Sequence, residues 1–507
     1  MSTVPMMIAL ERNSSAPLHR QIYLALRASI LEQRLRPGAR LPATRVLAND
    51  LGVSRTTVLA AYDQLAAEGF VTALGGGGTR VAPALADARD RSPRTMTRAS
   101  ATHRMQPVEA SPFSAAISAV YSTQPADHSV VAVTGTPRRF VPLAVGCPAL
   151  DVFPVGIWAR LMSRRWRRST TTMLLPDDVA GYRPLREAIA QYITTARAVR
   201  CTADQVIVTA GAQQAIDLTA RVLIRAGDAV WMEEPGYPPA RAAFAGAGAR
   251  VIPVPVDGDG LCVSAGRTAA PTARLAFITP SFQAPLGTVM SLTRRLELLH
   301  WADTANAWVL EDDYNGEFRY DGSQSAALQG LEHPGARRVI FVGSFSKTLF
   351  PALRLGFAVV PQECVEAFAH ARFTADRHSP VIEQAVLADF IADGHFARHM
   401  RRMRALYAER QRMLVKLARR ELGSLVSIDP APAGMRLLAW LPRGVSDRRV
   451  AAEAARRGVS VAALSNLRTA PSQENALLLG FAPFSATEMR RGLSALGDAI
   501  RCVARGE

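Results

Sequence analysis

The sequence contains almost no lysine. Of the 60 lysine and arginine side chains among its 507 residues, only Lys347 and Lys416 are lysines. A guanidinium stays protonated in proteins, whereas a lysine amine can lose its proton and act as a nucleophile. Arginine therefore cannot replace a lysine whose chemistry needs a free amine, and the surroundings of the two lysines decide whether one has that role.

Paired cysteines and long apolar runs are also absent. The five cysteines form no CxxC pair, which is typical of small buried residues in a reducing compartment rather than of disulfides or a metal site. No segment reaches about 18 uncharged apolar residues, and residues 1–13 lack the basic start and apolar run of a leader. These absences predict a cytoplasmic protein with no membrane contact and no bound metal.

The charge balance is strongly basic. Lysine and arginine exceed aspartate and glutamate by 17 charges at pH 7, which suits a polyanionic partner such as nucleic acid or a phosphate-bearing ligand. A GC-rich genome that favours alanine and arginine codons explains the same excess equally well.

The chain is long enough for at least two domains, and its 49% hydrophobic content can fill their cores. Residues 84–138 hold arginines, serines and prolines without a sustained apolar period, which is typical of a linker. We therefore expect a small domain over 1–83, this linker, and a large domain over 139–507.

Helical patterns fill the first domain. Apolar residues recur at helical spacing over 18–30. A short helix is expected over about 44–51, then a turn at Gly52 and a second helix capped by Ser54. The core stripe of that last helix is Val58, Ala61, Tyr62 and Leu65. Two helices joined by a tight glycine turn form a helix-turn-helix.

The last of these helices begins with residue types that read DNA. Arg55, Thr56 and Thr57 follow its cap, and such side chains at a helix N-terminus reach phosphates and base edges in the major groove. After Gly69, two β-like runs flank four glycines, which predicts a hairpin wing. A helix-turn-helix used only for packing is the alternative.

This order of elements resembles the winged helix-turn-helix of the GntR superfamily, along nearly the whole of residues 1–83. The resemblance implies that the domain binds double-stranded operator DNA. By the same resemblance, the residues that contact DNA are Arg45, Arg55, Thr56 and the wing glycines Gly76, Gly77 and Gly78.

The large domain alternates short apolar runs with helical patterns. Six such runs lie at 205–211, 229–237, 274–281, 307–314, 338–347 and 354–361. Strands rich in valine and isoleucine that alternate with helices predict an α/β fold with a mostly parallel sheet. Ligands bind at the carboxyl ends of the strands in such folds.

Lys347 lies just after one of these strands. Ser344 precedes it by three residues, and Arg354 follows it by seven. A lysine amine can attack an aldehyde to form a Schiff base, and a hydroxyl and a guanidinium beside it suit a phosphate. The three residues together predict pyridoxal 5′-phosphate (PLP), held as an internal aldimine on Lys347. A solvated surface lysine is the alternative.

The run 307–314 supplies an acid for the ring nitrogen of PLP. Asp312 and Tyr314 are two residues apart and so point to one face of a strand, whereas Glu311 and Asp313 would point away. Asp312 can then meet the pyridine nitrogen while Tyr314 hydrogen-bonds the ring hydroxyl. Both join Lys347 as predicted catalytic residues, and a solvated acidic turn is the alternative.

Three further stretches complete the predicted cofactor site. The backbone N–H groups of Gly211, Ala212 and Gln213 open a helix and can cradle a phosphate. Tyr237 offers an aromatic plate for the ring, and Gln283 offers a polar partner for the ring oxygen. Each alone is more often an ordinary loop residue, and only their order along the chain makes the set specific.

These motifs resemble those of fold type I PLP enzymes of the aminotransferase class I and II group. The segments EEPGYP, TPSFQAPLG, EDDYNGEFRY and GSFSKTLFPALRLG carry the resemblance across almost the entire domain. Joined to a GntR-type domain, the chain resembles the MocR/GabR group of bacterial transcriptional regulators. The resemblance implies a homodimer in which both chains line each pocket. Residues 1–83 carry a net charge of only +4, so DNA binding is expected to need two copies.

The chain departs from that group around the pocket. Phe282 and Leu286 stand where related sequences usually have histidine and threonine, and Pro176 stands near the place of a tyrosine that reaches the partner's phosphate. No arginine occupies the usual places for binding an amino-acid carboxylate. The candidates to replace it are Arg241, Arg436 and Arg468, and the sequence does not choose among them.

Two functions remain open. The first is a PLP-dependent, DNA-binding transcriptional regulator whose effector is an amine, an amino acid or PLP itself. The second is an aminotransferase that carries a DNA-binding domain, with Lys347 moving the proton. The absent carboxylate clamp counts against the second, because catalysis needs the amino acid held in one orientation. A pure repressor with an empty pocket would leave Ser344, Lys347 and Arg354 without a purpose.

Overall fold

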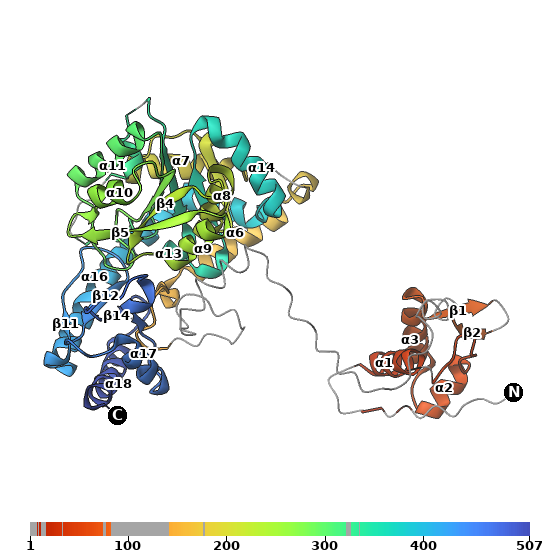
Figure 1. Cartoon of the computed structure of the whole chain (residues 1–507). Helices are drawn as coiled ribbons and strands as arrows, with labels where there is room; N and C mark the ends of the chain where they lie inside the picture. The colour runs from red at the N-terminus through yellow and green to blue at the C-terminus, as the bar shows by residue number, and fades with distance from the viewer. Residues whose placement is uncertain are drawn as a thin grey trace, which may run out of the picture. The chain divides into compact units, whose positions relative to one another are not determined.

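The computed structural model describes residues 8, 10–11, 17–32, 34–74, 78–82, 141–175, 178–320, 326–333 and 335–506. The chain forms two compact units, Met1–Pro107 and Val108–Glu507 (Figure 1). The predicted linker over 84–138 lies outside the described residues, as do Gly76, Gly77 and Pro176.

The small unit is the predicted helix-turn-helix with a hairpin. Its elements are α1 (Leu18–Leu31), α2 (Thr44–Leu51), α3 (Arg55–Ala67), β1 (Val71–Leu74) and β2 (Gly78–Val81). Gly52 ends α2 in the left-handed conformation, and the Ser54 side chain caps α3 by accepting from the Thr57 N–H. The predicted stripe on α3 is buried against α1, and β1 pairs with β2 antiparallel. The prediction for this unit is confirmed.

An eight-stranded sheet forms the centre of the large unit. Its strands lie in the order β3-β10-β9-β8-β7-β4-β5-β6. Their bounds are β3 (Val206–Thr209), β4 (Ala229–Glu234), β5 (Arg250–Asp257), β6 (Gly260–Leu261), β7 (Leu275–Ile278), β8 (Trp308–Asp312), β9 (Val339–Ser344) and β10 (Gly356–Val359). Only β10 and β6 run antiparallel to their neighbours. All six predicted runs are strands, and the α/β prediction is confirmed.

Helices cover both faces of this sheet (Figure 1). Alternate residues along each strand face opposite sides, so Val206 and Val208 pack into one core and Ile207 into the other. One face is covered by α8 (Ala212–Leu223), α9 (Pro238–Gly246) and α14 (Val365–Asp376). The other is covered by α6 (Val155–Arg167), α7 (Arg183–Arg197), α10 (Val263–Ala269), α11 (Leu292–Thr304), α12 (Leu328–Leu331), α15 (Val381–Ala392) and α16 (His395–Glu421).

A second, antiparallel sheet follows near the C-terminus, which the sequence did not predict. Its order is β11-β12-β14-β13. Its elements are β11 (Ser427–Ile428), β12 (Arg436–Trp440), α17 (Asp447–Arg456), β13 (Ala462–Ala463), β14 (Ala476–Gly480) and α18 (Ala486–Arg505). One face packs on α16, α17 and α18, while Leu438, Leu467 and Leu478 lie in a separate apolar cluster.

Two expectations about composition can be compared with the structure. All five cysteines are free thiols, but only Cys364 is buried and the other four are partly exposed, so the prediction of buried cysteines holds for one of them. Among the described residues, no helix combines the length and the apolar character needed to span a membrane.

Candidate functional site

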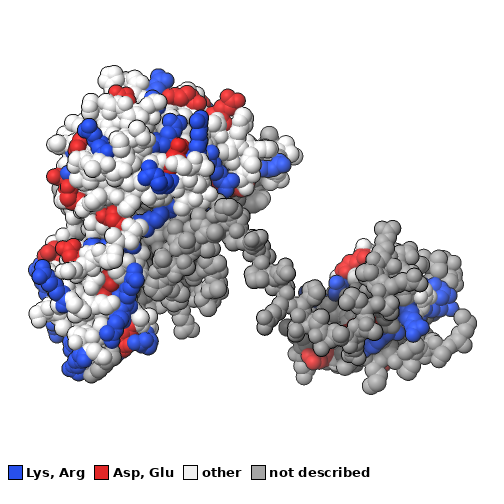
Figure 2. Space-filling view, in the orientation of Figure 1, with Lys and Arg blue, Asp and Glu red and all other residues white. Residues whose placement is uncertain are grey.

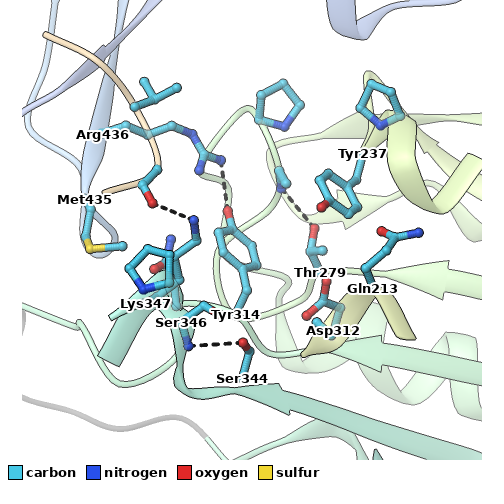
Figure 3. Close-up of a pocket in the computed structure, with 18 of the residues that line it drawn as sticks. Gln213, Tyr237, Thr279, Asp312, Tyr314, Ser344, Ser346, Lys347, Met435 and Arg436 are labelled. Atoms are coloured by element: carbon cyan, nitrogen blue, oxygen red, sulfur yellow. Dashed lines mark hydrogen bonds between the residues drawn. The ribbon is translucent and has the colours of Figure 1, made fainter. Parts of the chain in front are cut away.

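A cavity of about 320 Å³ lies where the parallel strands of the large sheet end. The side chains that close it follow β4, β7, β8 and β9, with further walls from α8 and β12 (Figure 3). Eight of the ten predicted cofactor residues line it: Ala212, Gln213, Tyr237, Asp312, Tyr314, Ser344, Lys347 and Arg354. The sheet therefore gathers residues that are up to 142 positions apart in the chain.

Lys347 enters the cavity from the short helix α13 (Phe345–Thr348), which begins where β9 ends. Its Nζ donates a hydrogen bond of 2.6 Å to the carbonyl oxygen of Gly146. Gly146 also lines the cavity, and it lies just beyond the first described residue of the large unit, Val141. The amine is thus directed into the cavity by the end of a buried strand and contacts a segment that is distant in sequence.

Asp312 is the last residue of β8 and is 5% exposed. Its Oδ1 has no hydrogen-bond partner in the described structure. Burial, together with the smaller effects of the Asp313 and Glu233 charges, raises the pKa of this carboxyl to about 7, while the charge of Lys347 opposes the shift. A buried acceptor without a donor is costly, so the carboxyl is suited to a ligand that brings a buried N–H.

The two acids beside Asp312 are held elsewhere. Glu311 accepts hydrogen bonds from the Leu328 N–H at 2.8 Å and the Gln329 N–H at 2.9 Å. Asp313 pairs with the buried Arg197, with Nε and Oδ2 2.7 Å apart. The prediction that these two side chains point away from the site is confirmed.

The turn into α8 approaches Arg354 closely. Gly211, which caps α8, has a φ of +112°. A Cβ at this position would lie 3.1 Å from Nη2 of Arg354. Gly211 is not itself part of the cavity wall, but its lack of a side chain lets the guanidinium lie against the helix N-terminus. The amides of a helix start beside a guanidinium favour a phosphate.

Serine side chains also line the cavity. Ser344 caps α13, and its Oγ accepts a hydrogen bond of 3.2 Å from the Ser346 N–H (Figure 3). Ser346 also lines the cavity and was not predicted. Its position two residues after Ser344 is the signal that would have identified it.

Tyr314 and Tyr237 supply the two aromatic rings of the cavity. The Tyr314 hydroxyl accepts a hydrogen bond of 2.8 Å from Nη2 of Arg436 (Figure 3). Burial raises the pKa of Tyr314, and the adjacent guanidinium lowers it. The structure thus adds a partner for Tyr314 that the motif did not contain.

Gln283 lies outside the cavity, contrary to the prediction. It is 1% exposed and does not line the cavity. Its Nε2 donates to Glu233 and to the carbonyls of Pro235 and Ala284, while its Oε1 accepts from the Leu286 N–H. The side chain holds its own loop to the end of β4, and this arrangement argues against the predicted contact with the ring oxygen.

The residues fit PLP on three observations. Asp312 presents a buried acceptor without a partner, which suits a ring N–H. The glycine at 211 leaves room for a guanidinium beside a helix N-terminus, which suits a phosphate. A primary amine, Lys347, enters the same cavity.

The small unit presents most of its predicted DNA contacts to solvent. Arg45, Arg55 and Thr56 are exposed, whereas Thr57 is half-buried and its hydroxyl lies 2.7 Å from Ser54 Oγ. Arg55 Nε donates to the Thr44 hydroxyl across the turn at 3.3 Å. The exposure of Arg45, Arg55 and Thr56 is compatible with DNA contact, which stays a prediction.

An arginine that the sequence did not predict as a DNA contact, Arg40, lies beside the described end of the wing. Gly78 begins β2 with a φ of +81°, and a Cβ there would lie 2.9 Å from Nε of Arg40. Arg40 is exposed and pairs in an isolated bridge with Arg80. No motif signal pointed to Arg40, because its place beside the wing depends on the folded hairpin.

Comparisons with known proteins agree with this geometry. A model of the aminotransferase class I and II family matches residues 139–495, and a model of the gntR family of bacterial regulatory proteins matches residues 18–81. The probable rhizopine catabolism regulatory protein MocR of Rhizobium meliloti is 40% identical and aligns over 97% of this chain and 96% of its own. The pyridoxine biosynthesis transcriptional regulator PdxR of Corynebacterium glutamicum is 28% identical, over 97% and 98%.

One solved structure is similar to the large unit. It is LysN, the alpha-aminoadipate aminotransferase of Thermus thermophilus, in complex with N-(5′-phosphopyridoxyl)-L-leucine. The TM-score is 0.67 at 29% sequence identity, and the match covers 72% of this chain and 93% of that one.

Proposed function

This chain belongs to the aminotransferase class I and II family and is a PLP-dependent transcriptional regulator of the MocR type; we propose that its cavity senses a small amine through Lys347. The observation that carries the proposal is the pairing, in one cavity, of Lys347 with a buried carboxyl that lacks a hydrogen-bond donor, Asp312.

The cavity residues divide the binding of PLP among them. Asp312 would accept from the ring nitrogen, and Tyr237 would lie along the ring. The N-terminus of α8, Ser344 and Arg354 would hold the phosphate. When bound, PLP supplies an aldehyde that condenses with primary amines and a ring that takes up electrons.

Lys347 is also suited to couple the cavity to the rest of the chain. Its amine donates to Gly146, in the segment that follows residues 83–140. The same segment is held to β14 by a hydrogen bond of 2.7 Å from the Gly480 N–H to the Leu143 carbonyl. An effector amine that takes the place of Lys347 on PLP would release the lysine amine, which could then donate to Gly146. Transcription responds if the effector favours one arrangement of the units over another.

The first test is an absorption spectrum of the purified protein with PLP, before and after borohydride. We expect a Schiff-base band that borohydride fixes to the Lys347 peptide and that is absent from Lys347→Arg, because a guanidinium does not condense with the aldehyde. The matched control is Lys416→Arg, since Lys416 is the other lysine of the chain and is exposed on α16. A band that persists in Lys347→Arg would refute the assignment.

The regulatory step has its own measurement. DNA affinity is compared for the protein without PLP, with PLP, and with PLP and a panel of amines. An amine effector requires that at least one amine changes this affinity and that Lys347→Arg abolishes the change. Repeated conversion of PLP by an amino donor and a keto-acid acceptor, without any effect on DNA binding, would support the aminotransferase alternative instead.

A further inference from the structure

The three candidate arginines for an anionic group are distinguished by their neighbours. Arg241 forms an ion pair with Glu234, with Nη2 and Oε2 3.3 Å apart, and Arg468 lies 3.7 Å from Glu474. Neither lines the cavity at the strand ends, whereas Arg436 does. No ion pair of Arg436 with a carboxylate is found among the described residues.

Arg436 is held in place by neutral groups. Its guanidinium lies 5.2 Å from the ring centre of Phe282 and 5.6 Å from that of Tyr314. Nη2 donates to the Tyr314 hydroxyl at 2.8 Å and to the Gln283 carbonyl at 3.3 Å, while Nε is buried without a partner. These ring contacts and hydrogen bonds hold the guanidinium in place, and none of these described partners carries a negative charge.

The departure at Phe282 is part of this arrangement. A Cβ at Gly434 would lie 2.3 Å from the Phe282 ring, so the absent side chain at 434 makes room for that ring beside β12. Arg436 begins β12, two residues further on. The phenylalanine and the glycine together therefore hold the arginine at the cavity.

Apolar residues make up part of the cavity lining that also contains Arg436. They are Val145, Met435, Leu467 and Leu478. Leu478 lies in β14 and packs with Leu467 in the apolar cluster of the small sheet. A ligand that binds between Lys347 and Arg436 thus contacts both hydrocarbon and a partly desolvated cation. The hydrocarbon favours a ligand with an apolar body, and the cation favours a ligand with an anionic group.

We propose that Arg436 binds a carboxylate of the effector, and that the effector is a primary amine with an apolar body and a carboxylate. The inference rests on the proposed function, because it assumes that Lys347 and PLP receive the amine. It assigns to Arg436 the anion-binding role that the sequence left open among three arginines. Phe282 is the positioning residue that keeps Arg436 at the cavity.

The test uses the full chain loaded with PLP and three probes. L-norleucine and 6-aminohexanoate carry a carboxylate at opposite ends of the same pentylamine skeleton, and pentylamine carries none. Apparent dissociation constants come from the change of the visible band. We expect one of the two carboxylates to bind at least about tenfold more tightly than pentylamine, because hydrogen bonds between charged groups contribute that much.

Variants then identify the arginine. The preference is measured as the ratio of the affinity for the carboxylate probe to that for pentylamine, because losing the contact between Arg436 and the Tyr314 hydroxyl affects all three probes alike. Arg436→Met should abolish this preference, and Arg436→Lys should restore part of it. Phe282→Leu should weaken the preference without removing it. Arg468→Met is the matched control, and its preference should equal that of the unmodified protein.

The outcomes separate the two proposals. Equal affinity for all three probes, or an equal loss of affinity for all three in Arg436→Met, would overturn the role of Arg436 while leaving amine sensing intact. Loss of the preference in Arg468→Met but not in Arg436→Met would assign the anion to the other arginine. A Lys347 band that responds to none of the probes would count against amine sensing itself.

Discussion

Asp312 and Glu311 are neighbours in β8 and both are buried, yet only one has its hydrogen-bond acceptors occupied. Glu311 accepts from two backbone N–H groups, while Asp312 Oδ1 accepts from none. Burial raises the pKa of each to about 7. The difference is that none of the described residues donates to Asp312 Oδ1, so the pKa of Asp312 should depend on the cofactor.

The pH dependence of stability tests this in cofactor-free protein. The Asp312 carboxyl ionises near its ordinary pKa of 3.8 in the unfolded chain and near 7 in the folded one, so the folded state is destabilised progressively as pH rises through that window. Asp312→Asn removes this dependence. From pH 5 to pH 8 the unmodified protein should lose about 3 kcal/mol more than Asp312→Asn, since about two pKa units of that window lie below the folded pKa and one unit corresponds to about 1.4 kcal/mol.

Urea unfolding at several pH values measures the difference. Asp303→Asn is the control, because Asp303 is exposed on α11. Saturating PLP should reduce the difference. If the free energy of unfolding changes with pH in the same way in the unmodified protein and in Asp312→Asn, ionisation of Asp312 does not destabilise the folded state.

At the scale of secondary structure elements, the start of α8 is fixed by a second helix. The Ala210 N–H donates to Gln214 Oε1 at 2.7 Å, and Arg372 on α14 donates to Gln214 at 2.5 Å and to the Val208 carbonyl at 2.8 Å. Arg372 is fully buried. The turn that approaches Arg354 is therefore rigid before any phosphate binds, which lowers the entropic cost of binding.

Gly211→Ala should disturb this turn. The added Cβ lies 3.1 Å from Nη2 of Arg354, and the φ of +112° is unfavourable for alanine. We expect PLP affinity to fall by about tenfold or more, which corresponds to about 1.4 kcal/mol. The measurement is a PLP titration followed by absorbance.

Gly227→Ala is the matched control for this substitution. Gly227 has a φ of +90° with no atom within 4 Å of the added Cβ, so it tests strain without the guanidinium. Both variants should lose similar stability, but only Gly211→Ala should lose PLP affinity. Equal PLP affinity in the two variants would contradict the proposal that the start of α8 and Arg354 bind the phosphate of PLP.

For the whole molecule, the excess of positive charge is not confined to the DNA-binding unit. Residues 1–83 carry a net charge of +4 out of +17 for the chain. On the face of the large unit drawn in Figure 2, basic and acidic side chains are intermixed rather than gathered in one basic patch. DNA affinity is therefore expected to depend on a few arginines of the small unit, used in two copies.

The dependence of DNA affinity on salt concentration measures how many phosphates the protein contacts. If Arg55 contacts a phosphate in each of two copies, Arg55→Ala should reduce the slope of log affinity against log salt by about 1.8, since each contact contributes about 0.9. Affinity should fall similarly on all sequences if only phosphates are contacted. Arg20→Ala, exposed on α1, is the control. An unchanged slope would exclude Arg55 from the phosphate contacts.

The sequence alone determined what depends on short spacings. The two-residue period of a strand put Asp312 and Tyr314 on one face and turned Glu311 and Asp313 away, as the structure has them. The helix-turn-helix, the six central strands and the lysine chemistry are likewise local, and the matches to the aminotransferase and gntR families confirm the resemblance drawn from those motifs.

Only the tertiary structure decided which distant segments meet. Arg436 is 122 residues from Tyr314, and no period or motif relates them; they meet because β12 of the second sheet passes beside the end of β8. The same holds for Gln283, whose amide is occupied by Glu233 from another strand 50 residues earlier. A side chain's partners depend on the packing of whole elements. The sequence therefore predicted the type of site, while the position of Arg436 at the cavity and the contacts of Gln283 needed the fold.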